Sequence, residues 1–270
     1  MTHRPKLIAT DLDGTIVPHY GAISQRTVDA FTQAHEMGVE VFFATGRPPR
    51  WMRDIDATFA FGSAICCNGA MLYDLKSDTV LEEWGISIDA QIEAVKKLRV
   101  AIPQISFAVE SSDYFHREKG YIAHYDVGLD EIGQDLIEKA MKSPALKLMA
   151  RCTNQELTSD EMMHLATEAV GDLVTITHSN PNESHLEISA IGVSKGTTLA
   201  IMAGRLGIEA KDCVSFGDNP NDFSMLQWCG RSYAMADGHP DGKKYAKGVA
   251  PAHTADGVAI ILEELLQLPA

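Results

Sequence analysis

The 270-residue sequence has no apolar run approaching the roughly 18 residues that a membrane-spanning helix needs, and it carries no apolar targeting segment at its start. Lysine and arginine cluster only as short pairs, and the formal net charge is −14. Such a charge disfavours non-specific binding to nucleic acid or to an anionic membrane surface. We therefore expect a cytoplasmic protein that binds neither a membrane nor nucleic acid.

Frameworks of disulfides or of zinc ligands are missing as well. The five cysteines are an odd number and form no CxxC pair, and the ten histidines show no HExxH or comparable spacing. The thiols are therefore expected to be reduced. Repeats and low-complexity segments are also absent, and the length allows one globular domain or two.

The stretch around which the chain is organised is KLIATDLDGT at residues 6–15, where a short apolar run leads into Asp11 and Asp13 and then Gly14. In an extended segment, residues i and i+2 point to the same side, so the two carboxylates should emerge together at the end of a strand. Two like charges placed so closely must share a cation or a proton.

The segment up to residue 83 predicts a doubly wound α/β sheet. Ser24 is expected to cap a helix that ends near Gly38, and the apolar strand 39–43 follows and leads to Thr45. A helix at 49–59, a strand at 64–67 and an Asn-Gly turn into residues 71–73 come next. A strand, a helix and a buried strand in succession indicate a βαβ unit with a parallel sheet, whose ligands bind at the carboxyl ends of the strands.

The pattern changes at residue 84 and resumes after residue 185. Between them we expect a helix capped by Ser87 with a stripe of Ile92, Val95, Leu98 and Ile102, a hairpin at 105–115 and a helix near 132–141. A strand at 147–151, a capping-box helix that starts at Thr158, and strands at 174–178 and 185–189 complete an α+β domain. The prediction is an inserted domain at 84–185 within a domain made of 1–83 and 186–270.

The C-terminal part returns to the first pattern. It predicts a helix at 194–206, a buried strand at 213–216 followed by GDNPND, a strand at 232–235 and an amphipathic helix at 258–268. Lys195 then lies at a helix start, and Asp218, Asn221 and Asp222 follow a strand end. These residues are expected near Asp11 at one edge of the sheet.

The residue types gathered at that edge suit a metal ion and a phosphoryl group. Three carboxylates beside a glycine loop make a hard, oxygen-rich site, which favours Mg²⁺. Thr45 offers a hydroxyl and Gly46 a backbone N–H to phosphoryl oxygens, while Lys195 adds positive charge at a helix N-terminus. An aspartate in such a site can attack phosphorus, so Asp11 is the candidate nucleophile and Asp13 the candidate acid and then base.

These motifs resemble those of the haloacid dehalogenase superfamily of phosphotransferases. DLDGT resembles its first motif, ATGR its second, GVSKG its third and GDNPND its fourth, and the four occur in the family's order. An insertion between the second and third motifs, with CNGA and GDNPNDFSML, resembles the Cof-type branch with a C2 cap. The resemblance implies a Rossmann-like core, an α+β cap that sets substrate specificity, an Mg²⁺ cofactor and a phosphatase that works through an aspartyl-phosphate.

Residue roles carried over from the resemblance fall into four groups. They imply Asp11 as nucleophile and Asp13 as acid and base; a metal site of Asp11, Asp13 through its carbonyl, and Asp218; a phosphate site of Leu12, Thr45, Gly46, Lys195 and Asn221; and Asp222 as support for that site, with Arg47 as a candidate for contacting substrate. One departure is that the family often has MGNA where this chain has residues 235–238, Met-Ala-Asp-Gly, followed by His239.

Several alternatives stay open. The substrate is expected to be a small phosphorylated metabolite: a sugar phosphate, a nucleotide, flavin mononucleotide or pyridoxal phosphate. A phosphomutase of the same superfamily and a non-catalytic regulator that binds a phosphorylated ligand are the rival functions. Both a monomer and a small homo-oligomer are compatible with the sequence.

Overall fold

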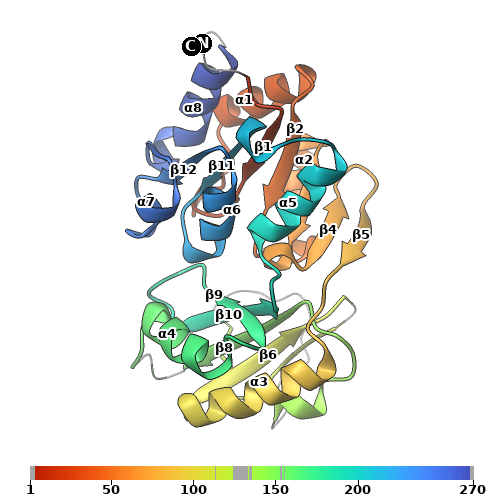
Figure 1. Ribbon diagram of the computed structural model, residues 1–270, viewed down its shortest axis with the longest axis vertical. Helices are drawn as coiled ribbons and strands as arrows, with labels where there is room; N and C mark the ends of the chain where they lie inside the picture. The colour runs from red at the N-terminus through yellow and green to blue at the C-terminus, as the bar shows by residue number, and fades with distance from the viewer. Residues whose placement is uncertain are drawn as a thin grey trace. The chain divides into compact units, whose positions relative to one another are not determined.

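A computed structural model describes residues 4–112, 114–123, 133, 136–152, 154 and 156–267. The chain divides into two compact units, one made of Met1–Glu82 with Ser194–Ala270 and the other of Glu83–Val193. We call them the core unit and the inserted unit (Figure 1). The predicted fold class, a doubly wound α/β core with an inserted α+β domain, is confirmed.

The core unit is built on an eight-stranded sheet in the order β13-β12-β11-β1-β2-β3-β4-β5. The pairs from β13 to β3 are parallel, and β4 runs antiparallel to β3. The strands are β1 (Leu7–Thr10), β2 (Glu40–Ala44), β3 (Ser63–Cys66), β4 (Met71–Asp74), β5 (Thr79–Glu83), β11 (Cys213–Gly217), β12 (Arg231–Met235) and β13 (Gly248–Ala250). Because β11 and β2 flank β1, their carboxyl ends bring the first, second and fourth motifs to one edge.

Two sets of helices cover this sheet. The described helices are α1 (Gln25–Glu36), α2 (Arg53–Phe59), α5 (Lys195–Arg205), α6 (Phe223–Trp228), α7 (Gly242–Tyr245) and α8 (Gly257–Leu266). Helix α1 packs with α2 and α8, while α5 packs with α6 (Figure 1). Ser24 caps α1 as predicted, since its hydroxyl accepts from the Thr27 amide. Phe31 of α1 and Phe59 of α2 pack on Phe43 of β2 and fix those helices to the sheet.

The inserted unit has a five-stranded antiparallel sheet in the order β7-β6-β8-β10-β9. Its elements are α3 (Ile88–Ala101), β6 (Ile105–Glu110), β7 (Phe115–Arg117), β8 (Lys147–Cys152), α4 (Ser159–Val170), β9 (Val174–Thr177) and β10 (His185–Ala190). Alternate residues such as Leu148, Ala150 and Ile188 form one apolar core with α3 and α4. The helices therefore cover a single face of this sheet. The capping box at Thr158 is present.

Four details differ from the sequence expectation. The inserted unit ends at Val193 rather than residue 185, because β10 pairs with β8 and β9 in the second sheet. Residues 49–59 form a 3₁₀ turn (Pro49–Trp51) and then α2. Ile92 is exposed, and Gln91 is buried in its place, donating to the carbonyls of Ile86 and Ser143. Of the helix expected at 132–141, residues 132, 134 and 135 lie outside the described residues, and the described part contains a 3₁₀ turn, Ile137–Lys139, in place of an α-helix.

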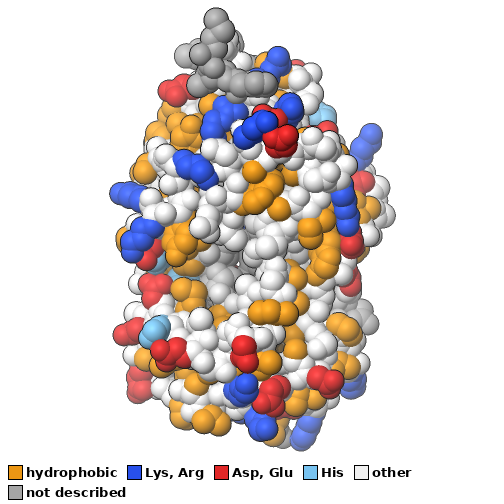
Figure 2. Space-filling model, viewed as in Figure 1, with side chains coloured by type: hydrophobic (Ala, Val, Ile, Leu, Met, Phe, Trp, Pro, Cys, Tyr) orange, Lys and Arg blue, Asp and Glu red, His pale blue; other side chains and the backbone are white. Residues whose placement is uncertain are grey.

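Among the described residues, no helix is both long and apolar enough to cross a membrane. Lysine, arginine, aspartate and glutamate side chains are interspersed on the face shown in Figure 2. This distribution agrees with the absence of long basic runs from the sequence.

Candidate active site

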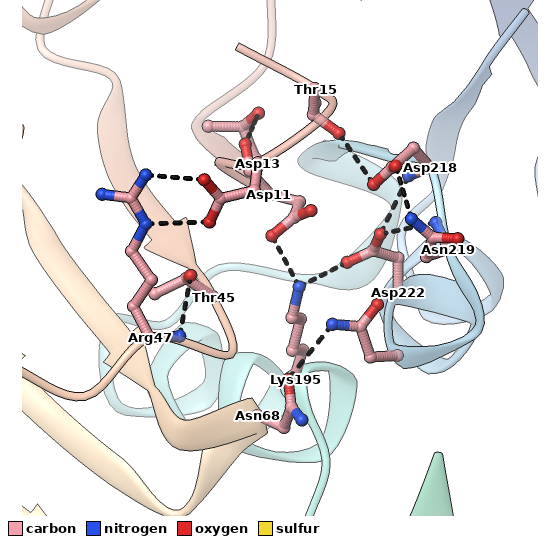
Figure 3. A network of polar contacts seen from close by, with 12 residues as sticks. Asp11, Asp13, Thr15, Thr45, Arg47, Asn68, Lys195, Asp218, Asn219 and Asp222 are labelled. Carbon is pink, nitrogen blue, oxygen red and sulfur yellow. Dashed lines mark hydrogen bonds and ion pairs between the residues drawn. The ribbon is translucent and has the colours of Figure 1, made fainter. Parts of the chain in front are cut away.

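The centre of the site is a lysine held between two aspartates. The Lys195 ammonium lies 2.7 Å from Asp11 Oδ1 and 2.7 Å from Asp222 Oδ1 (Figure 3). Lys195 and Asp222 have no exposed surface, and Asp11 is 5% exposed. Burial on this scale is tolerated because each charge has an opposite charge within hydrogen-bond distance.

Local sequence explains why Lys195 points there. Ser194 caps α5 by accepting from the Thr197 amide, so the lysine occupies the first turn of the helix. Gly196 lies so close to the neighbouring segment that a Cβ would come within 2.4 Å of the Ser224 carbonyl carbon. The Gly196 amide also donates to Ser224 Oγ. The SKG triplet therefore caps the helix, supplies the charge and allows close packing on α6.

The loop after β11 presents Asp218 and is held by Asp222. Asp222 Oδ2 accepts from the backbone amides of Asp218 at 2.8 Å and Asn219 at 3.1 Å. The Asp218 carboxylate accepts from the Asn219 side chain at 2.6 Å and from the Thr15 hydroxyl at 3.4 Å. Both oxygens of Asp222 are thus committed, one to Lys195 and one to the loop backbone.

Gly14 is required where the first and fourth motifs meet. Its φ is +80°, a left-handed conformation that side chains rarely adopt, and a Cβ would lie 2.5 Å from Asp218 Oδ2. The glycine of DLDGT therefore provides both the turn and the space for the third carboxylate.

Burial and like charge shape the ionisation of these groups. Burial, followed by the negative charge of Asp222, raises the pKa of Asp11 to about 7, although Lys195 acts in the opposite direction. Burial and the charges of Asp11 and Asp222 also hold the pKa of Asp218 well above its usual range. Burial lowers the pKa of Lys195, but Asp11 and Asp222 outweigh it and raise the value above that of a free lysine.

The donor set fits a divalent cation. One carboxylate oxygen each from Asp11, Asp218 and Asp222 lie within 4.8 Å of one another, all in buried positions. Only hard oxygen donors meet there, which suits Mg²⁺ better than zinc or copper. Because Asp222 already serves Lys195 and the loop, Asp11 and Asp218 are the side chains best placed to bind the ion.

Asp13 lies apart from this cluster and pairs with Arg47. The guanidinium binds it in a bidentate manner, with Nε 2.8 Å from Oδ2 and Nη2 2.6 Å from Oδ1 (Figure 3). Arg47 Nη1 also donates to Asp54 and to the Trp51 carbonyl. The Asp13 side chain is half-exposed, at 56%, whereas that of Arg47 is at 15%. The predicted acid–base residue is therefore accessible, and it is held by the arginine of ATGR.

The remaining predicted phosphate ligands surround the same edge. Thr45 is buried, and its hydroxyl accepts from the Arg47 amide at 3.1 Å. Asn221 donates through Nδ2 to Asn68 Oδ1 at 3.2 Å, and its own Oδ1 is buried with no hydrogen bond to any described residue. Leu12 is fully buried directly after Asp11, and Gly46 is partly buried after Thr45.

Sequence reasoning missed several neighbours of the site. Asn68 of the CNGA turn adopts a left-handed conformation and contacts Asn221, while Thr15 and Asn219 contact Asp218. Each lies within or beside a motif that was already recognised, so position in the motif was the available signal. No sequence signal pointed to Asp54, because an aspartate in the first turn of a helix is common.

Comparisons with known proteins identify the family of the chain. A sequence model of the haloacid dehalogenase-like hydrolases matches residues 8–262. Pyridoxal phosphate phosphatase YbhA of Escherichia coli strain K12 is 25% identical over 262 residues, covering 94% of this chain and 96% of that protein. The 5-amino-6-(5-phospho-D-ribitylamino)uracil phosphatase YcsE of Bacillus subtilis strain 168 is 24% identical over 265 residues, covering 94% and 93%.

Solved structures show the same fold. The HAD subclass IIB sugar phosphatase BT4131 has a TM-score of 0.80 at 21% identity, covering 98% of this chain and 100% of that one. The chain therefore belongs to the haloacid dehalogenase-like hydrolases. It has the fold of the subclass IIB phosphatases of that superfamily, and the resemblance predicted from the four motifs is confirmed.

Proposed function

We infer that the protein is a magnesium-dependent phosphatase of small phosphorylated metabolites and that it works through an aspartyl-phosphate on Asp11. Membership of the family and the phosphatase names of its relatives support the reaction class. The observation that carries the mechanism is the fully buried Lys195 held at 2.7 Å from both Asp11 and Asp222. A buried cation beside a carboxylate lowers the repulsion that an anionic nucleophile meets when it approaches a phosphate.

The phosphoryl group is bound by the residues around Asp11. Lys195 provides the positive charge, and Thr45, Gly46, Leu12 and the Asn221 amide provide neutral polar groups at the same edge. Mg²⁺, held by Asp11, Asp218 and the Asp13 carbonyl, would neutralise negative charge on the phosphoryl oxygens. The two backbone amides that donate to Asp222 Oδ2, those of Asp218 and Asn219, keep Asp218 in place.

In the first step, an Asp11 oxygen attacks phosphorus and the bond from phosphorus to the leaving oxygen breaks. A proton from Asp13 goes to that oxygen, so the leaving group departs as a neutral alcohol. In the second step, Asp13 takes a proton from water as the water oxygen attacks phosphorus. The bond between phosphorus and Asp11 then breaks, which releases inorganic phosphate and restores both carboxyl groups.

Arg47 has a role in this cycle through Asp13. The bidentate contact from Nε and Nη2 fixes the position and the orientation of the Asp13 carboxylate, and both proton transfers require this placement. Arg47 therefore acts as a positioning residue for Asp13.

The inserted unit is the proposed specificity domain. Its sequence position between the second and third motifs matches that of the cap in the family. YbhA, YcsE and BT4131 are named for a cofactor phosphate, a ribityl phosphate and sugars, so this branch acts on varied leaving groups. We propose a small phosphorylated metabolite of that kind as the substrate.

Release of inorganic phosphate from a metabolite panel, with and without Mg²⁺, tests the function. The wild type should release phosphate from at least one compound only when Mg²⁺ is present, and Asp11→Asn should release none while unfolding at a similar temperature. Turnover by Asp11→Asn at the wild-type rate would remove the nucleophile assignment. Failure of the wild type to turn over any compound with Mg²⁺ would count against the enzyme itself.

A further inference from the structure

The loop after β12, residues 235–239, lies directly against the backbone of Asp218. The His239 amide donates to the Asp218 carbonyl at 2.6 Å. A Cβ on Gly238 would come within 2.6 Å of that same oxygen and 2.9 Å of the Asp218 Cα. On the other side, Asp222 Oδ2 accepts from the Asp218 amide. The backbone of the metal-binding aspartate is therefore fixed at both its N–H and its carbonyl.

The same loop is tied to a distant segment by Asp237. Its Oδ1 accepts from the His253 amide at 3.1 Å, and its Oδ2 lies 2.6 Å from His253 Nδ1. The His253 side chain is only 12% exposed. Two hydrogen bonds from one residue to one carboxylate fix both its position and its orientation. Asp237 immediately precedes Gly238, so this tether acts on the residue that packs on Asp218.

A hollow of about 190 Å³ lies beside Thr15, which contacts the same aspartate. Both His253 and Thr15 line it, and Thr15 donates to Asp218 Oδ1 at 3.4 Å. The edge of the His19 ring meets the His253 ring with centroids 5.5 Å apart. Asp237 and His253 thus belong to one layer of residues that supports Asp218, and neither of them is among the proposed ligands of Mg²⁺.

We propose that Asp237 and His253 form a positioning pair for the metal site: the pair holds the loop 235–239 so that Gly238 and His239 fix the backbone of Asp218. This inference rests on the proposed function, because it assumes that Asp218 binds Mg²⁺. Chains that have Asn-Ala in place of Asp237 and Gly238, as the family often does, lack a carboxylate at this position. The hydrogen-bonded tether between Asp237 and His253 is therefore a property of this chain's own residues.

The test compares Mg²⁺ binding with stability in the same experiment. The unfolding temperature of the full-length protein is measured without metal and over a Mg²⁺ titration, so that each variant gives its own metal-free stability and its own Mg²⁺ dissociation constant. Asp237→Ala and His253→Ala should each weaken Mg²⁺ binding about fivefold to tenfold, as expected for the loss of a hydrogen bond that positions the loop. The double variant should be no weaker than either single one.

Two further variants separate positioning from bulk packing. Asp237→Asn keeps an oxygen for the His253 amide and gains an NH2 group that donates to the unprotonated Nδ1 of a neutral His253, so both hydrogen bonds are retained and Mg²⁺ binding should stay within about twofold of the wild type. His19→Ala removes the ring contact but leaves the tether, and its Mg²⁺ binding should be unchanged. Unaltered Mg²⁺ binding in both alanine variants at Asp237 and His253, with only the metal-free stability lowered, would overturn the inference. A wild type that binds no Mg²⁺ would overturn the proposed function together with it.

Discussion

Lys195 is the side chain on which the geometry of the site depends. It has no exposed surface and holds together Asp11, which follows β1, and Asp222, which closes the loop after β11. A buried pair of this kind adds little net stability over apolar packing, but removing one partner is costly because it leaves a charge unpaired. Lys195 is therefore needed both to balance the two buried carboxylates and to supply positive charge in the proposed reaction.

Replacing Lys195 with Met should lower the free energy of unfolding by about 3 to 5 kcal/mol, because Asp11 and Asp222 are left buried without a cation. Urea unfolding of the metal-free protein measures this loss. Lys6→Met is the matched control, since Lys6 pairs with Asp212 at 2.9 Å but its side chain is 54% exposed. That surface pair should contribute less than about 1 kcal/mol. Equal losses in the two variants would contradict the account of Lys195.

Gly14→Ala should abolish most of the phosphate release, because the new Cβ would lie 2.5 Å from Asp218 Oδ2 and force that carboxylate to move. Gly21→Ala is the control: Gly21 also has a positive φ, +95°, but has no atom within 4 Å of its Cβ position. Both variants carry the backbone cost of about 1 kcal/mol. Activity should fall in Gly14→Ala alone, and an equal fall in both would show that the turn rather than Asp218 is responsible.

At the scale of elements, the sequence predicted well wherever periodicity and capping agreed. Helices α1 and α5 begin after Ser24 and Ser194, and the strands that directly precede Asp11, Thr45 and Asp218 lie where short apolar runs indicated. Predictions from the sequence failed where tertiary contacts overrode the local pattern. Ile92 fitted the apolar stripe of α3, but the amide of Gln91 is buried there by its hydrogen bonds to two carbonyls.

Pairing partners were harder to predict than elements. Strand β10 was predicted as an element of the α+β domain, but its position between β8 and β9 depends on hydrogen bonds that no local pattern encodes. The Asp13–Arg47 and Asp237–His253 contacts likewise join residues 34 and 16 positions apart. The motifs therefore predicted which residues gather at the site, whereas the specific partners required the structure.

Strand β10 also makes a pH-dependent contribution to stability through His185. Burial lowers the pKa of His185 from 6.5 to about 3, with Arg151, Lys147 and His178 acting in the same direction and Glu187 against it. Between pH 6.5 and 3, the unfolded chain therefore binds a proton that the folded chain does not. Stability is retained above pH 6.5 and is lost as the pH falls, by up to about 1.4 kcal/mol per pH unit.

Urea unfolding of the wild type and of His185→Gln across this pH range isolates the effect. Glutamine keeps a polar group near the Tyr121 hydroxyl, which lies 3.0 Å from His185 Nε2, but it cannot be protonated. The gap in unfolding free energy between the two proteins should shift in favour of His185→Gln as the pH falls from 6.5 to 3. Parallel pH profiles would contradict a neutral, buried His185.

At the scale of the whole molecule, the function that we propose divides between the two units. The core unit gathers every proposed ligand of the metal and the phosphoryl group, from strands whose order in the sheet brings distant motifs together. The inserted unit has its own sheet and its own apolar core. In the proposal, the core unit carries the chemistry and the inserted unit selects the leaving group; the relatives YbhA, YcsE and BT4131 are named for different substrates.

The central claim, that Asp11 carries the phosphoryl group, is tested most directly in Asp13→Asn with an aryl phosphate and Mg²⁺. An aryl leaving group needs no proton, so the first step should proceed, whereas the second step lacks its base. A burst of one phenol per enzyme should appear, and acid-quenched protein should carry one phosphoryl group on the peptide that contains Asp11. Steady turnover without a burst, or a phosphoryl group on another residue, would contradict the account.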